Sequence, residues 1–129
     1  MRAREWEARL RLYAFQLEEM RRQVADIELM IADFSRKREE LEMAVRMEER
    51  NAGVDDPKDV RYPLAALDMR KRHENLGQSI ESLKEQLKIA IKRVEEAQEE
   101  LETAREQAER EGVEMITAPE AMPGAHPLS

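Results

Sequence analysis

The chain has 129 residues, of which 40% are charged and 4% are aromatic, and its net charge is −7. This length suits one domain, and so polar a composition excludes a thick globular core. The abundance of charged residues, leucine and alanine is typical of long helices that share a thin apolar seam. Because the chain has no cysteine, disulfides, thiolate metal sites and cysteine nucleophiles are excluded.

The charge is distributed unevenly along the chain. Residues 1–22 hold six arginines against four glutamates, a balance of +2, whereas residues 95–114 hold nine glutamates against two arginines, a balance of −7. We expect these two segments to lie side by side and attract each other. The overall negative charge would repel a phosphate backbone, so no nucleic-acid partner is expected.

Membrane-spanning and targeting segments are not expected. No run approaches the ~20 consecutive apolar residues that a membrane-spanning helix needs. The N-terminus is charged from Arg2 onward and lacks the apolar segment of a signal peptide. We therefore expect a cytoplasmic protein that meets a membrane only through its partners.

The first predicted helix covers about residues 2–51. Its apolar residues recur in steps of three and four, which is the seam pattern of a coiled coil, and Arg38 is the one break in the series. No proline or glycine interrupts the chain before Gly53. The predicted seam positions are Trp6, Leu10, Tyr13, Leu17, Met20, Val24, Ile27, Ile31, Phe34, Arg38, Leu41 and Val45.

A connecting loop is predicted over residues 52–62. Gly53 offers a left-handed cap to the first helix, and the Asp-Pro and Tyr-Pro pairs that follow favour extended or turn geometry. Either Asp56 or Asp59 is expected to cap the second helix. Because the loop is short, the two helices should pack antiparallel.

The second predicted helix covers about residues 63–112 and repeats the spacing of three and four. A fold-back in the loop would place its C-terminal alanines beside the large side chains near the N-terminus, so that small and large residues interdigitate. The predicted seam positions are Ala66, Met69, His73, Leu76, Ile80, Leu83, Leu87, Ala90, Val94, Ala97, Leu101, Ala104 and Ala108. The sequence thus predicts an all-α fold, an antiparallel coiled-coil hairpin over residues 1–112, with a disordered tail over residues 113–129.

Catalytic and cofactor-binding motifs are not found. The chain has no glycine-rich phosphate loop, and its carboxylates are expected on solvated helix faces beside lysine and arginine. His73 is expected to be a partly buried seam residue whose edge reaches water. We therefore expect no enzyme, no cofactor, no metal site and no small-molecule substrate.

Several apolar residues fall outside the seam and should face water unless a partner covers them. A broader seam would account for Met30 and Ile91. Leu12, Phe15, Leu29 and Ile89 lie away from the seam, and for them partner contact or self-association stays open beside a broader seam. Gly77 lies within the second helix, where glycine costs about 1 kcal/mol relative to alanine. The apolar residues outside the seam are Leu12, Phe15, Leu29, Met30, Met43, Met47, Leu64, Leu67, Ile89 and Ile91.

The layout of residues 1–112 resembles the FliJ family of flagellar type III protein export, in particular its alphaproteobacterial branch. The resemblance rests on two long helices of similar length and on short local strings. These strings are RLRLYAFQ at residues 9–16, RRQVADIE at residues 21–28, MIADF at residues 30–34, GVDDP at residues 53–57, and Tyr62-Pro63. The loop string is the most specific of them.

The resemblance implies a non-enzymatic stalk in the flagellar export apparatus. Members of the family are antiparallel coiled coils that insert the end carrying both termini into the hexameric export ATPase ring. They stimulate that ATPase, contact the cytoplasmic domain of the export gate, and handle export chaperones. The implied location is the cytoplasm, at the inner membrane beneath the flagellar base.

Partner-binding residues are inferred at both ends of the predicted hairpin. On the gate-binding surface Leu76 fits the family pattern, while Arg72 stands where the family has an aromatic residue. Two alternatives stay open: a generic coiled-coil adaptor or scaffold, and a holdase chaperone, neither with an ATPase partner. The candidate partner-binding residues are Arg2, Arg4, Arg9, Leu12, Phe15, Tyr62, Leu67, Arg72 and Leu76.

Overall fold

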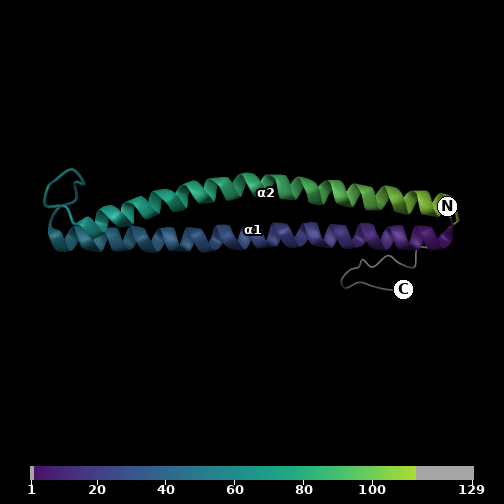
Figure 1. The fold of residues 1–129 in the computed structure, drawn as a ribbon, viewed down its shortest axis with the longest axis horizontal. Helices are drawn as coiled ribbons and strands as arrows, with labels where there is room; N and C mark the ends of the chain where they lie inside the picture. Colours follow the sequence, from purple (N-terminus) through teal and green to yellow (C-terminus); the bar gives the residue numbers. More distant parts are fainter. Residues whose placement is uncertain (1, 113–129) are drawn as a thin grey trace. The chain divides into compact units, whose positions relative to one another are not determined.

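The protein is described by a computed structural model that places residues 2–112. Helix α1 spans Ala3–Ala52 and helix α2 spans Leu64–Arg110, and no strand occurs in the placed part of the chain. The two helices pack against each other in opposite directions (Figure 1). The fold is therefore the predicted all-α antiparallel hairpin, and the predicted tail over residues 113–129 lies outside the described residues.

Helix α1 begins with half of a capping box. The carbonyl of Arg2 accepts the first helical hydrogen bond, from the Trp6 amide at 3.1 Å. The Glu5 carboxylate accepts a hydrogen bond from the Arg2 amide at 2.8 Å. This is the contact that a glutamate three residues after the cap makes in a capping box, and it satisfies an amide that the helix leaves without a partner.

Helix α1 ends in the left-handed cap that the sequence predicts. Gly53 has a φ of 69°, a backbone conformation that glycine adopts without steric cost. The Gly53 amide bonds to the Arg50 carbonyl at 3.3 Å, and the Val54 amide bonds to the Glu49 carbonyl at 3.3 Å. These two bonds define a Schellman motif, which stops the helix and turns the chain into the loop.

The loop aspartates do not cap helix α2, and that prediction is wrong. Asp56 accepts a hydrogen bond from the Lys58 amide and Asp59 accepts one from the Arg61 amide, each at 2.9 Å. Both are side-chain turns inside the loop. Helix α2 begins after Pro63, whose carbonyl accepts the first helical hydrogen bond, from the Leu67 amide at 3.2 Å.

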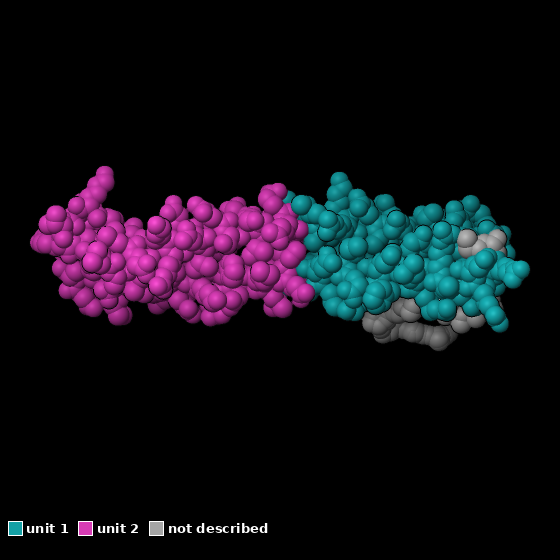
Figure 2. Space-filling view, in the orientation of Figure 1, with its two compact units in different colours: residues 1–25, 88–129 teal, residues 26–87 magenta. Residues whose placement is uncertain are grey.

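The described chain divides into two compact units, coloured in Figure 2. Unit 1 combines the first part of α1, up to residue 25, with α2 from residue 88 onward, and unit 2 comprises residues 26–87. Every predicted seam residue of both helices is buried or half-buried. The three-and-four spacing therefore identified the packed face of each helix correctly.

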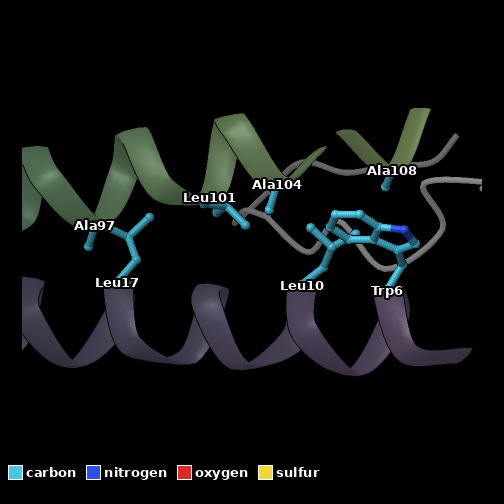
Figure 3. Close-up of a cluster of buried hydrophobic side chains, with 7 residues drawn as sticks. All are labelled: Trp6, Leu10, Leu17, Ala97, Leu101, Ala104 and Ala108. Carbon is cyan, nitrogen blue, oxygen red and sulfur yellow. The ribbon is translucent and has the colours of Figure 1, made fainter. Parts of the chain in front are cut away.

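Unit 1 holds a continuous apolar core. Large side chains of α1 face small ones of α2: Leu17 points toward Ala97, and the Trp6 ring lies beneath Ala108 (Figure 3). This confirms the predicted match of large residues with alanines. The core residues are Trp6, Leu10, Leu17, Ala97, Leu101, Ala104 and Ala108, with Tyr13, Ala14, Met20 and Val94 packed against them.

Unit 2 has fewer fully buried side chains. Val45, Ile80 and Leu83 are buried in its seam, whereas Arg38 and His73 occupy other seam positions and are half-buried. A second small cluster of Val54, Tyr62 and Ala66 fastens the loop to the start of α2. Unit 2 thus combines a thin apolar seam with half-buried polar side chains that need hydrogen-bond partners.

Candidate partner-binding surfaces

The apolar residues that the sequence places outside the seam are all exposed. Phe15 is 60% exposed in unit 1, and Leu29 is 69% exposed in unit 2. Met30 and Ile91, which a broader seam was expected to cover, are also more than 40% exposed. The fold itself leaves these side chains in water. Leu12 and Phe15 are three residues apart, so they are neighbours on the surface of α1.

A groove of about 650 Å³ opens between the two helices of unit 2. Its apolar part is formed by Phe34 and Leu41 from α1 and by Leu76 from α2. The small residues Ala44 and Ser79 flank these side chains, and they leave the edge of the seam uncovered. Grooves of this kind accept the apolar face of an amphipathic helix.

Basic side chains stand at the rim of the unit 2 groove. Arg72 donates to Asp68 at 3.0 Å, and Lys37 lies 3.3 Å from Asp33, in both cases within one helix. Arg72 is therefore held beside the groove, next to Leu76. The structure brings these two candidate residues together, and it adds Phe34 and Leu41, which the sequence had indicated only as seam residues.

The N-terminal candidate residues lie on α1 in unit 1. Arg4, Leu12 and Phe15 are exposed. The Arg9 guanidinium lies 5.9 Å from the centroid of the Trp6 ring, a cation–π contact. Arg2 is exposed and its backbone takes part in the helix cap described above. These residues remain accessible to a partner.

Tyr62 is buried, and its surroundings assign it a structural role in place of a partner contact. Its hydroxyl donates to Glu49 at 2.6 Å and accepts from Arg70 at 2.8 Å. Arg70 also donates to Glu49 at 2.9 Å. The three side chains join the end of α1, the loop and the start of α2. Leu67, a candidate on the same part of α2, is 40% exposed and stays accessible.

The electrostatics of this cluster follow from its hydrogen bonds. The bond from Tyr62, and then the bond from Arg70, hold the pKa of Glu49 below its ordinary value. Burial, and then the bond to Glu49, raise the pKa of the Tyr62 hydroxyl. Glu49 therefore stays ionised and Tyr62 stays protonated at neutral pH, which preserves the cluster.

His73 is the partly buried seam residue that the sequence predicts. Its Nε2 atom lies 2.7 Å from a carboxylate oxygen of Glu42 on the facing helix. This hydrogen bond lowers the pKa of Glu42. Within residues 2–112, no group of three or more histidine, aspartate or glutamate side chains is arranged to hold a metal ion.

One exposed apolar residue was not predicted from the sequence. Val60, in the loop, is 99% exposed. Val60 lies between charged residues in the loop, outside both helices. The spacing of apolar residues along a helix therefore says nothing about its exposure. The groove of unit 2 was also missed, because it depends on which residues of the two helices face each other.

Comparisons with protein-family models, with characterised proteins and with solved structures find no match for this chain. In the part of the chain that the structure describes, neither helix is long and apolar enough to cross a membrane. The function is therefore inferred from the exposed residues and the fold.

Proposed function

We propose that this protein is a non-enzymatic component of the flagellar type III protein export apparatus. In this proposal it binds and stimulates the hexameric export ATPase, and it links that ATPase to the cytoplasmic domain of the export gate and to export chaperones. The local strings that resemble the FliJ family support this class of partner. The fold of two antiparallel helices is the one that the resemblance requires.

The observation that carries a binding function is the set of exposed apolar side chains beside a seam that is already filled. Leu12 and Phe15 in unit 1 are 52% and 60% exposed, although the core of that unit is complete without them. Side chains that are more than half exposed contribute little to the stability of the fold, and neighbouring exposed apolar side chains are common where a protein meets a partner.

The two units would serve different partners. Unit 1 carries Arg4, Arg9, Leu12 and Phe15, and we assign it to the export ATPase. Unit 2 carries the groove beside Leu76, and we assign it to the export gate or an export chaperone. An apolar groove between two helices suits an amphipathic segment.

The proposal is tested by the turnover of the export ATPase from the same organism, measured with and without the full chain. We expect stimulation by the wild-type chain and its loss in the double variant Leu12→Ser/Phe15→Ser. Because both side chains are more than half exposed, the variant should keep its helical circular dichroism. A matched control, Leu29→Ser/Met43→Ser, removes two apolar residues of unit 2 that are also more than half exposed, and it should still stimulate the ATPase.

Two results would contradict this function. If the wild-type chain neither stimulates the ATPase nor co-elutes with it, the export role is wrong and a generic coiled-coil adaptor becomes the better hypothesis. If both double variants lose stimulation equally, the ATPase contact is not specific to unit 1.

A further inference from the structure

Unit 1 contains a second groove, of about 530 Å³, on one side of its seam. Trp6, Arg9 and Tyr13 line it from α1, and Glu96, Glu99 and Glu100 line it from α2. Its size falls within the range of about 300–1,000 Å³ that ligand-binding pockets occupy. In contrast to the groove of unit 2, its walls are mainly charged and aromatic.

The groove has an excess of negative charge. Three glutamates line it against the single Arg9. Glu96 has Lys92 and Arg93 one helical turn before it, whereas no basic residue lies three or four positions from Glu99 or Glu100, where an ion pair within α2 would form. Glu96 and Glu100 are themselves four residues apart, so their like charges repel. A cation from outside the chain would relieve this repulsion.

The Trp6 side of the groove is already covered by a cation of this chain. The Arg9 guanidinium lies 5.9 Å from the centroid of the Trp6 ring. Trp6 is itself fixed by the hydrogen bond that its Nε1 atom donates to Glu111 at 2.9 Å. Because Trp6 is 3% exposed, a partner would reach the glutamates and the half-buried Tyr13, and guanidinium groups bind well to carboxylates.

We propose that the groove of unit 1 binds a basic amphipathic helix of a partner protein, with arginine or lysine side chains placed against the three glutamates beside Tyr13. A helix suits the site because the groove runs between two packed helices. An anionic partner such as a nucleic acid would be repelled by the same carboxylates. The proposal adds a surface to unit 1 and does not depend on the identity of the partners proposed above.

The test uses the full chain and a synthetic amphipathic helix built from leucine, alanine and arginine, labelled for fluorescence anisotropy. A twin peptide carries glutamate in place of each arginine. We expect the arginine peptide to bind, and the glutamate peptide not to bind. The groove variant Glu96→Gln/Glu99→Gln/Glu100→Gln should raise the Kd of the arginine peptide at least about tenfold, because the charges that it contacts are gone.

The matched control is Glu95→Gln/Glu102→Gln/Glu106→Gln. It removes the same charge from the same helix at exposed positions that do not line the groove. Its effect on the Kd should stay within about threefold, because salt screens charges that are not in contact with the peptide. Trp6 is the single tryptophan of the chain, so its emission should change with the arginine peptide alone.

Three results would overturn the proposal. The first is an equal loss of affinity in the groove variant and the control variant, which would indicate attraction to overall charge. The second is the absence of binding by the arginine peptide. The third is concentration-dependent self-association in analytical ultracentrifugation that the groove variant abolishes, because the occupant would then be a second copy of this chain.

Discussion

Units 1 and 2 use the same spacing of seam positions and fill them with different chemistry. In unit 1 the seam is apolar, and large residues of α1 pack on alanines of α2. In unit 2 the seam includes Arg38 and His73, and hydrogen bonds such as His73 to Glu42 join the two helices. One helical register can therefore support either an apolar core or a polar interface.

The difference has an energetic consequence. Apolar burial stabilises unit 1 in proportion to the area removed from water, whatever the detail of the contacts. A polar pair in a seam adds little net stability, but it is costly to leave one partner unpaired. We infer that unit 1 contributes more of the free energy of unfolding. The stability of unit 2 depends on each polar seam residue keeping its hydrogen-bond partner.

The largest expected effect is from an unpaired charge in the seam of unit 2. Leu83 is 6% exposed, and Leu83→Asp would bury a carboxylate without a partner, at a cost of about 3–5 kcal/mol. Circular dichroism should show the loss of most of the helix. Gln86→Asp is the control, since Gln86 is exposed on the same helix. Unchanged helicity in Leu83→Asp would contradict the seam register.

The second prediction compares leucines in the two units. Leu101 is 5% exposed in the core of unit 1, so Leu101→Ala should destabilise the protein by about 2–4 kcal/mol. Leu76 is half-buried beside the groove of unit 2, so Leu76→Ala should cost only about 1 kcal/mol. Urea unfolding measures both. Equal losses would show that the two seams contribute alike.

The seam could be predicted from the sequence because it depends only on spacing within each helix. The contacts across the seam could not be predicted in the same way. Glu42 and His73 are 31 residues apart, and Glu49 and Arg70 are 21 apart, so their meeting depends on how the loop aligns the two helices. The groove beside Leu76 is lined by Ala44 from α1 and Ser79 from α2. Their positions beside Leu76 also depend on how the loop aligns the two helices.

The loop was predicted in part. Gly53 identified the end of α1, because a left-handed residue is needed there and glycine supplies it. The role of Asp56 and Asp59 was mistaken, because an aspartate can close a turn within a loop as readily as it can cap a helix. The burial of Tyr62 was not foreseen, since it depends on Glu49 and Arg70 from the two helices.

The third prediction concerns acid. The pKa values of Glu42 and Glu49 in unit 2 are lowered, mainly by hydrogen bonds from His73 and Tyr62 respectively. The pKa of Glu111 in unit 1 is lowered mainly by the bond from Trp6. A carboxyl group with a lowered folded pKa contributes its full stability above the unfolded value of about 4.3, and that contribution is lost as pH falls through the folded pKa.

The urea midpoint should therefore fall as the pH is lowered below about 4.3. We expect Glu42→Gln/Glu49→Gln to be less stable than wild type at neutral pH and to show a flatter acid response. Glu111→Gln should flatten it less, because it removes one such group in place of two. A steeper acid response in the unit 2 variant than in wild type would contradict the assignment of these bonds to unit 2.

The smallest effect is expected at Gly77, in the seam region of unit 2. A Cβ atom added there would lie 3.5 Å from Nη1 of Arg38, an ordinary contact with the end of a flexible side chain. Gly77→Ala should therefore raise the free energy of unfolding by about 0.5–1 kcal/mol, because alanine is the better helix former. Gly53→Ala is the control: its φ of 69° is unfavourable for alanine, so it should destabilise by about 1 kcal/mol. Destabilisation by Gly77→Ala would mean that the helices of unit 2 need the closer approach that only glycine allows.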